Sequence, residues 1–158
     1  MSTSDTIFKR IAWLCSRREY CSQGIMELLR RSGVEGRDAD DILSRLRQQK
    51  YVDDARYAGS FARDKALLAG WGPKKIAYAL SLKGIPDEMI RSALESVDED
   101  RSLRRMKEVL EVKWNSVKAP SPAERKLKVL RYAMSRGYSC AQIKKVLDFL
   151  EDHGEEDC

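Results

Sequence analysis

The chain has 158 residues, of which 42% are hydrophobic, 35% charged and 8% aromatic. This composition is too polar for a membrane protein, and no apolar run approaches the roughly 18 residues that a membrane-spanning helix needs. Residues Met1–Lys9 lack the apolar core and cleavage site of a signal peptide. We therefore expect a cytoplasmic protein without a membrane partner.

The sequence offers little material for enzyme or metal chemistry. Its four cysteines, Cys15, Cys21, Cys140 and Cys158, form no Cys-x-x-Cys pair, and its single histidine is His153. A structural zinc site needs four such ligands in paired spacings. No nucleophile and base pair or phosphate-cradling loop is evident either. We expect no metal, no cofactor and no catalytic residue, and we interpret Cys15 and Cys21 as small core or near-core residues.

The first predicted unit consists of three amphipathic helices, with glycine confined to the joints. The first helix lies around Ile11 and precedes a turn at Tyr20–Ser22. Ser22 is the expected N-cap of the second helix, which stops at Gly33. The third helix is predicted over residues 38–49. The apolar residues expected on these helices are Ile7, Ile11, Leu14, Ile25, Met26, Leu28, Leu29, Ile42, Leu43 and Leu46.

The second predicted unit begins at Asp53, a natural N-cap for a helix that ends near Gly70. The pair Gly72–Pro73 starts the next helix, because the amide hydrogen that proline lacks has no helical partner at this position. That helix stops at Gly84, and another follows Pro86. The residues expected on the apolar faces are Tyr57, Phe61, Leu68, Ile76, Ala79, Leu80, Met89, Ile90, Ala93 and Leu94.

The third predicted unit opens with a longer helix over residues 98 to about 114. A loop follows at residues 118–122, where two prolines forbid an unbroken helix. Ser121 is expected to cap a helix that runs to Gly137, and Tyr138–Ser139 opens the last helix. The expected apolar residues are Leu127, Leu130, Met134, Ile143, Val146, Leu147 and Leu150.

One turn recurs in each unit, at residues 20–22, 71–73 and 138–140. Apolar residues follow it four, seven and eight positions later, a spacing that keeps them on one helical face. Only Arg30 breaks the pattern, which makes the first unit the most divergent. Counted from Ser22, Gly72 and Ser139, the matching residues are Met26, Ile76 and Ile143, then Leu29, Ala79 and Val146, then Leu80 and Leu147.

These patterns predict an all-α fold of three tandem three-helix, helix-turn-helix-like repeats in an elongated, curved array. The predicted units are residues 1–52, 53–97 and 98–150, followed by an acidic tail at 151–158. Repeat arrays bury their cores unit by unit and present a long surface. This architecture favours a binding protein over an enzyme with one deep cleft.

Several motifs of the chain occur in the order found in the RecX family of bacterial regulatory proteins, which the chain resembles over roughly residues 8–150. The first unit matches through Arg18–Ser22, but carries Gly24 and Ile25 where the family tends to have an acidic residue and a leucine. The resemblance is most specific between residues 50 and 97. The motifs of the other two units are Tyr51–Ala58, Gly70–Ile76, Lys83–Ile85 with Ile90, Ala93 and Leu94, and Arg136–Ser139 with Ile143–Leu147.

The resemblance implies a non-enzymatic regulator of the RecA recombinase in DNA repair, homologous recombination and the SOS response. Such proteins lie along the groove of the RecA filament on single-stranded DNA and restrain ATP hydrolysis, filament growth and strand exchange. We expect a monomer that also binds single- or double-stranded DNA weakly and without sequence preference.

Positive charge is concentrated in one segment. Residues 1–100 hold 17 basic and 16 acidic side chains, whereas residues 101–145 hold 13 and 3, a net charge of +10, and residues 146–158 hold none and 6. Such an excess favours a polyanion or an acidic surface as partner over simple solvation of the helices. The candidate contacts are Arg101, Arg104, Arg105 and Lys107 in one stripe, Arg125, Lys126, Lys128 and Arg131 in a second, and Lys144 and Lys145.

Three further candidates flank the second turn. Lys74 and Lys75 begin a helix, where two cations and free backbone amides could face a phosphate or an acidic partner, although a solvated face is the simpler interpretation. Trp71 is the aromatic residue best placed to stack on a base, whereas the others are expected in the core. Asp53 and Asp54 are interpreted as helix caps and not as paired acid–base carboxylates.

Two alternatives stay open at this point. One is a nucleic-acid-binding module that acts without a recombinase, and the other is a protein-interaction scaffold that never touches DNA. The acidic tail is expected to fray, with a role in shielding the basic stripes from DNA as a further hypothesis.

Overall fold

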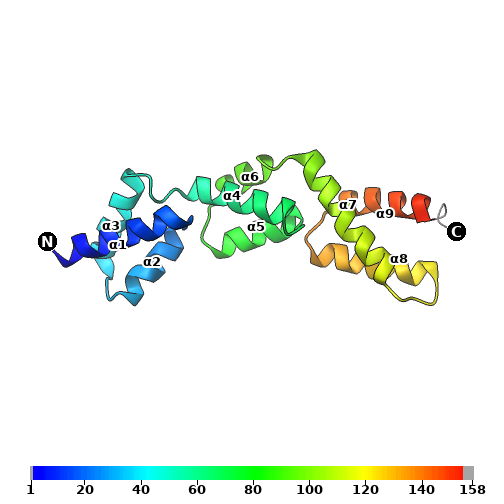
Figure 1. The fold of residues 1–158 in the computed structure, drawn as a ribbon, viewed down its shortest axis with the longest axis horizontal. Coiled ribbons are helices and arrows are strands. Elements are labelled where there is room, and N and C mark those ends of the chain that lie inside the picture. The colour runs from blue at the N-terminus through cyan, green and yellow to red at the C-terminus, as the bar shows by residue number, and fades with distance from the viewer. Residues whose placement is uncertain (1, 155–158) are drawn as a thin grey trace.

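Buried hydrophobic residues gather in three separate clusters, and each cluster is enclosed by three consecutive helices (Figure 1). The computed structural model describes residues 2–154, in which all regular structure is helical. Figure 1 shows the three groups of helices in a row along the longest axis, with the described ends of the chain at opposite ends. The helices are α1 Thr3–Arg17, α2 Ser22–Arg31, α3 Gly36–Gln48, α4 Asp54–Leu67, α5 Pro73–Leu82, α6 Asp87–Glu95, α7 Glu99–Ser116, α8 Pro122–Ser135 and α9 Cys140–Gly154. The all-α prediction is confirmed over the described residues.

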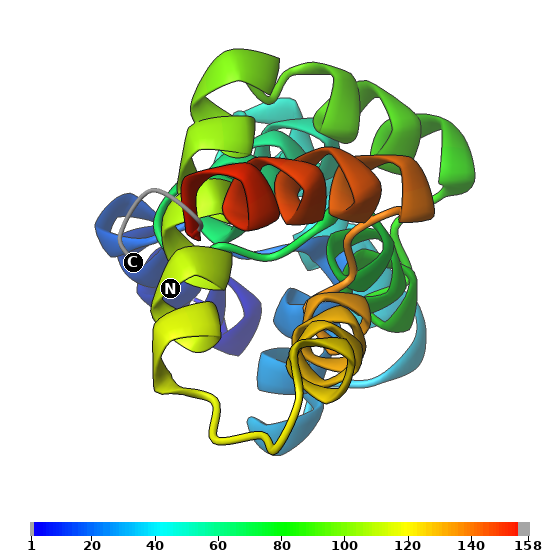
Figure 2. The same ribbon diagram turned by 90° about the vertical axis from the view of Figure 1, so that its right-hand side faces the viewer.

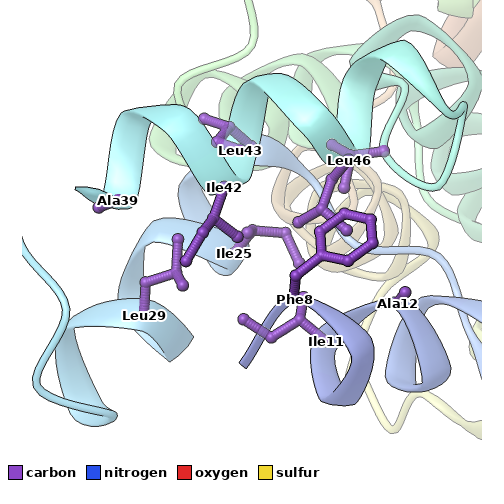
Figure 3. Close-up of a cluster of buried hydrophobic side chains, with 10 residues drawn as sticks. Phe8, Ile11, Ala12, Ile25, Leu29, Ala39, Ile42, Leu43 and Leu46 are labelled. Carbon is purple, nitrogen blue, oxygen red and sulfur yellow. The ribbon is translucent and has the colours of Figure 1, made fainter. Parts of the chain in front are cut away.

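The first cluster is formed by side chains of α1, α2 and α3. Figure 3 shows Phe8 and Ile11 of α1 turned toward Ile25 of α2 and toward Ile42 and Leu46 of α3. The sequence predicted a face of α1 around Ile7, Ile11 and Leu14, whereas Phe8, Ile11 and Ala12 are the residues buried there. The helix is rotated by about one position because the large Phe8 ring fills the centre of the unit.

The alignment of the three units differs from the predicted one by one residue in the first unit, whereas the second and third units align as predicted. The N-cap of α2 is Cys21, so Ser22 is already helical and its predicted capping role is wrong. Counted from Cys21, Gly72 and Ser139, buried Ile25, Ile76 and Ile143 stand at the fourth position, and buried Leu29, Leu80 and Leu147 stand at the eighth. The first unit is therefore regular where Arg30 had made it look divergent.

Two other predicted caps, Asp53 and Ser121, are present. The Asp53 carboxylate accepts the Arg56 amide hydrogen at 3.0 Å, and Ser121 accepts that of Glu124 at 3.2 Å. At the start of α9, Ser139 and Gln142 form a reciprocal capping pair, in which each backbone amide donates to the other side chain.

The third unit has a different order of helices. The recurrent turn lies between α1 and α2 and between α4 and α5, but in the third unit it lies between α8 and α9. The additional helix, α7, precedes this pair and packs against both members, as α6 packs against α4 and α5. This is the order predicted from the sequence for the third unit, in which a loop at residues 118–122 follows the first helix and Tyr138–Ser139 precedes the last. The exact boundaries at 52, 97 and 150 stay predictions.

Alanine, and not the large apolar residues, forms two of the buried helix faces. On α4 the buried residues are Gly59 and three alanines, Ala58, Ala62 and Ala66, which recur at every fourth position. On α8 they are Val129 and Ala133. Small side chains let helices approach closely, so the predicted core residues Leu68, Leu127 and Met134 are displaced to the surface.

Three helices lie along one edge of the molecule in the order α8, α5, α2 (Figures 1 and 2). Where α8 ends and α5 begins, the Gly72 amide donates to the Arg136 carbonyl at 2.6 Å, and the Lys74 amide donates to the Gly137 carbonyl at 3.0 Å. Where α5 ends and α2 begins, the Gln23 side-chain amide lies beside the Leu82 carbonyl, to which its nitrogen donates at 3.1 Å in one of the two amide orientations. Backbone N–H and C=O groups that have no partner within their own helix thus find one in the neighbouring unit.

Side-chain hydrogen bonds and an ion pair connect the first two units. The Ser22 amide donates to the Asp54 carboxylate at 2.7 Å, and Arg56 pairs with Glu19 at 2.8 Å. Cys21 is buried in the second cluster although it belongs to the turn of the first unit. Asp54, which the sequence assigned to its own helix, therefore caps the N-terminus of α2.

Replacing Asp54 with alanine should lower the free energy of unfolding by about 1 kcal/mol, since an N-capping oxygen is lost. The expected signature is faster hydrogen exchange at the Ser22 amide, 32 residues away. Asp53→Ala is the matched control, because it removes the cap of α4 and leaves the Ser22 partner in place. Unchanged Ser22 exchange in Asp54→Ala would contradict the assignment.

Candidate functional site

Two arginines of the first predicted basic stripe lie on the exposed side of α7. Arg101 and Arg104 are exposed and line a shallow groove of about 190 Å³ with Leu67, Arg105 and Glu108. We call this feature the α7 groove. It lies where α7 meets the end of α4, so two neighbouring units contribute to it.

The other two members of this stripe make internal contacts. Arg105 lies 3.0 Å from the Glu108 carboxylate and donates to the Leu68 carbonyl at 3.1 Å, which ties α7 to the end of α4. The ammonium group of Lys107 lies 4.7 Å from the Phe149 ring centroid, against α9. Arg105 thus borders the α7 groove while bonded within the protein, and Lys107 faces another helix.

Three of the four cations in the second predicted stripe also serve the fold. Arg125 donates to the Trp114 carbonyl at 2.8 Å and stacks 4.9 Å from the Trp114 ring centroid. Lys128 donates to the Lys118 carbonyl at 2.9 Å, so both residues hold the loop between α7 and α8. Lys126 pairs with Glu151 at 3.0 Å. The fourth cation, Arg131, is exposed, as are Lys126 and Lys128.

The predicted acidic tail is partly ordered. Helix α9 extends through residues 151–154, and Glu151 binds Lys126. The expectation of a frayed tail is therefore wrong for this part, and residues 155–158 lie outside the described part of the chain. On α9, Lys144 and Lys145 are both exposed.

The N-terminus of α5 does not offer the open anion site that the sequence suggested. The amides of Gly72 and Lys74 are bonded to the end of α8 and cannot bind an anion, whereas the Lys74 side chain is exposed. The Lys75 ammonium group lies 4.5 Å from the Trp71 ring centroid, and Lys65 lies 4.6 Å from the same centroid. These cations would compete with a base for the faces of the indole ring.

Trp71 itself packs in the second cluster. Its ring meets Phe61 edge to face at a centroid distance of 6.2 Å. It also lines a cavity of about 350 Å³ between the second and third units, together with Leu94, Leu103 and Lys145. The interpretation of Trp71 as a base-stacking residue is therefore not favoured by its surroundings.

The joint between the second and third units contains groups that sequence reasoning missed. Arg136 donates to the Ala69 carbonyl, and the buried Tyr138 hydroxyl donates to the Gly70 carbonyl. The motif Arg136–Ser139 was visible in the sequence, but its role in binding the preceding unit was not. These contacts hold the units beside the α7 groove in a fixed relation.

Burial raises the pKa of Tyr138 to about 12. Because its folded pKa lies above the unfolded value of about 10, the neutral phenol is favoured in the folded protein. The resulting stability is complete below pH 10 and is lost as the pH rises toward 12, a loss of up to about 3 kcal/mol. Tyr138→Phe should be less stable at neutral pH by about 1 kcal/mol, but its stability should fall less steeply in alkali.

Denaturant unfolding of both proteins from about pH 7 to about pH 11 measures this difference. The gap between wild type and Tyr138→Phe should narrow above pH 10. Tyr78→Phe is the control, since Tyr78 is exposed on α5. Parallel stability curves for wild type and Tyr138→Phe would contradict the burial of an ionisable hydroxyl at this joint.

The described residues contain no group of three or more His, Cys, Asp or Glu side chains that could hold a metal ion. Within the same part of the chain, no helix is both long and apolar enough to cross a membrane. The exposed cations are therefore the clearest functional feature, and they suit contacts with phosphates or carboxylates. The exposed residues among the predicted candidates are Lys74, Arg101, Arg104, Lys126, Lys128, Arg131, Lys144 and Lys145, of which Lys126 and Lys128 are bonded within the protein.

Comparison with known proteins gives consistent matches. Residues 53–94 match the family model for the second three-helix domain of RecX, and residues 99–147 match that for the third. Regulatory protein RecX of Vibrio vulnificus strain CMCP6 is 31% identical over 147 residues, which cover 93% of this chain and 92% of that protein. RecX of Bacillus licheniformis is 28% identical over 152 residues, or 94% of this chain and 58% of that protein.

The fold is also similar to a solved structure. The crystal structure of RecX from Lactobacillus salivarius superposes with a TM-score of 0.83 at 20% identity, covering 94% of this chain and 96% of that one. Some curated relatives are much longer, and the chain spans 50 to 58% of the length of four of them.

Proposed function

This chain belongs to the RecX family of regulatory proteins, and we propose that it regulates a RecA recombinase by binding along the recombinase filament on single-stranded DNA. Bound there, it inhibits ATP hydrolysis, filament growth and strand exchange. The proposal depends on one observation. The molecule is an elongated array of three units, and exposed arginines line a groove to which two of these units contribute.

The shape of the molecule supports binding across several filament subunits. A row of units can place separate contacts on neighbouring subunits, and each additional contact becomes an intramolecular event once the first has formed. The joint between the second and third units is held by backbone hydrogen bonds at Gly72 and Lys74. A bridge of this kind hinders the relative movements that subunits make during nucleotide turnover.

The α7 groove is the proposed contact for the anionic part of the filament. Arg101 and Arg104 reach solvent from one side of α7, and the backbone beneath them is fixed by Arg105. Because these cations are exposed, added salt screens their interactions. Each phosphate contact contributes about 0.9 to the slope of log affinity against log salt concentration, or about 0.7 on a single strand.

Reversing the charge of the α7 groove tests the proposal. In Arg101→Glu/Arg104→Glu, half-maximal inhibition of the DNA-stimulated RecA ATPase should require about 10-fold or more protein, and the salt dependence of filament binding should become shallower. The control is Arg37→Glu/Arg91→Glu, which makes the same charge change at exposed arginines of α3 and α6. The control should inhibit within about 2-fold of wild type, since surface changes away from a contact have small effects.

The outcomes also separate the two alternatives. Tight DNA binding by wild type, with no effect on the recombinase, would favour a nucleic-acid-binding module. Binding to the recombinase that responds neither to salt nor to the charge reversal would favour a protein scaffold. Equal loss of inhibition in the α7 groove variant and in its control would show that net charge, and not this groove, matters.

A further inference from the structure

Exposed apolar side chains are concentrated on two helices. Tyr78 and Leu82 of α5 are 67% and 62% exposed, and Leu127 and Met134 of α8 are 43% and 58% exposed. These are four of the seven large hydrophobic residues exposed in the described part of the chain. Scattered exposed apolar residues are normal, but their accumulation on neighbouring elements marks an interaction surface.

The four residues form a stripe on each helix. Tyr78 and Leu82 are separated by four positions, and Leu127 and Met134 by seven, so each pair lies on one helical face. The opposite faces point inward, since Leu80 of α5 and Val129 of α8 are fully buried. The side chains of each stripe therefore extend away from the core of their own unit.

The two helices that carry the stripes follow one another along one edge of the molecule. The end of α8 is hydrogen bonded to the start of α5 through Gly72 and Lys74, and Figure 1 shows the two helices in succession. Helices of 14 and 10 residues together extend about 36 Å at 1.5 Å per residue. We call this surface, made of Tyr78, Leu82, Leu127 and Met134 with the interspersed Lys74 and Arg131, the α5–α8 edge.

The charges beside the stripe have one sign. Lys74 precedes Tyr78 by one helical turn, and Arg131 lies between Leu127 and Met134, all of them at exposed positions. Helix α5 has no acidic residue, and α8 has one, Glu124, in its first turn. A complementary surface would therefore present apolar side chains bordered by carboxylates.

We propose that the α5–α8 edge is a docking surface for protein, whose partner is an apolar recombinase surface flanked by acidic side chains. This inference rests on the proposed function and assigns the protein contact to one edge, while the α7 groove takes the anionic contact. A nucleic acid is the poorer occupant, because aliphatic Leu82, Leu127 and Met134 gain nothing from a phosphate backbone. Tyr, Met and Arg are the residue types enriched where proteins meet.

The test removes apolar surface without changing charge. In Leu82→Gln/Met134→Gln, affinity for preformed RecA filaments on single-stranded DNA should fall about 10-fold or more, whereas binding to single-stranded DNA alone should not change. Trp13→Gln/Val112→Gln is the matched control, since Trp13 and Val112 are 57% and 70% exposed but lie outside the edge. The control should bind filaments within about 2-fold of wild type.

The possible results distinguish the docking surface from the proposed function. Wild-type filament binding by Leu82→Gln/Met134→Gln would overturn the docking surface and leave the proposed function standing. An equal loss of filament and free-DNA binding would show that the edge contacts nucleic acid, which also overturns it. Failure of the wild-type protein to bind filaments would overturn the proposed function itself, and this inference with it. Thermal unfolding of both variants near the wild-type temperature verifies that they fold.

Discussion

Replacing Gly72 with alanine should lower the free energy of unfolding by about 3 kcal/mol. A Cβ at this position would overlap the carbonyl carbon and oxygen of Gly137. The backbone of Gly72, with φ of −83°, suits any residue, so the cost arises from contact between the units and not from strain. Separating the turns also breaks the hydrogen bonds that join α8 to α5.

Denaturant unfolding followed by circular dichroism measures this loss. Gly24→Ala is the control, because a Cβ at this position in α2 has no neighbour closer than Cys21 Sγ at 3.8 Å. That change should be neutral or stabilising by up to about 1 kcal/mol, since alanine favours a helix over glycine. Equal stability of Gly72→Ala and wild type would show that the second and third units are not packed turn against turn.

Replacing Leu80 with alanine should destabilise the protein by about 2 to 5 kcal/mol. Leu80 is fully buried in the second cluster, and the lost methyl groups would leave a cavity among alanines that cannot expand to fill it. Leu82→Ala is the natural control, because Leu82 lies two positions further along the same helix and is 62% exposed. Its effect should stay within about 0.5 kcal/mol.

Thermal and denaturant unfolding measure the stability of these two variants. Both carry the same leucine-to-alanine change on α5, so a difference in stability reports the difference in burial. A loss of stability in Leu82→Ala as large as that in Leu80→Ala would contradict the orientation of α5. It would also remove the basis for the α5–α8 edge, which requires Leu82 to face solvent. The same measurement therefore checks the core and the surface of α5 together.

Local signals in the sequence were sufficient to predict most helix ends. Asp53, Ser121 and Pro73 stand where capping chemistry requires them, because each acts within one turn of its own helix. The first unit was misaligned by one residue, since the N-cap of α2 is Cys21, which makes no side-chain capping bond. The missing acceptor is Asp54, in the next unit, and no local pattern reveals a partner so distant.

The buried faces were predicted where they are formed by large residues and missed where they are formed by alanine. Ile143, Val146, Leu147 and Leu150 are buried as expected. On α8, the pattern Leu127, Leu130 and Met134 looked like a core face, but Val129 and Ala133 occupy the interior. Hydrophobicity alone predicts that leucine is buried in preference to alanine. Where helices pack closely, the smaller alanine occupies the buried position instead.

The candidate site was only partly predictable, because a sequence counts charges without revealing their partners. Arg105, Arg125 and Lys128 belong to the predicted basic stripes, yet each donates to a carbonyl group within the protein. Arg101 and Arg104 were predicted in the same way and are exposed beside the α7 groove. The division between structural and available cations depends on the long-range joints between units, which the sequence does not display.

The stoichiometry of binding to RecA filaments is the most direct test of the account. Wild-type protein is titrated onto filaments on single-stranded DNA while bound protein and ATP hydrolysis are measured together. If one elongated chain bridges neighbouring subunits, binding should saturate below one chain per RecA subunit, and ATP hydrolysis should fall in parallel. Saturation at one chain per subunit would contradict the bridging arrangement, and binding without any change in ATP hydrolysis would contradict the regulatory function.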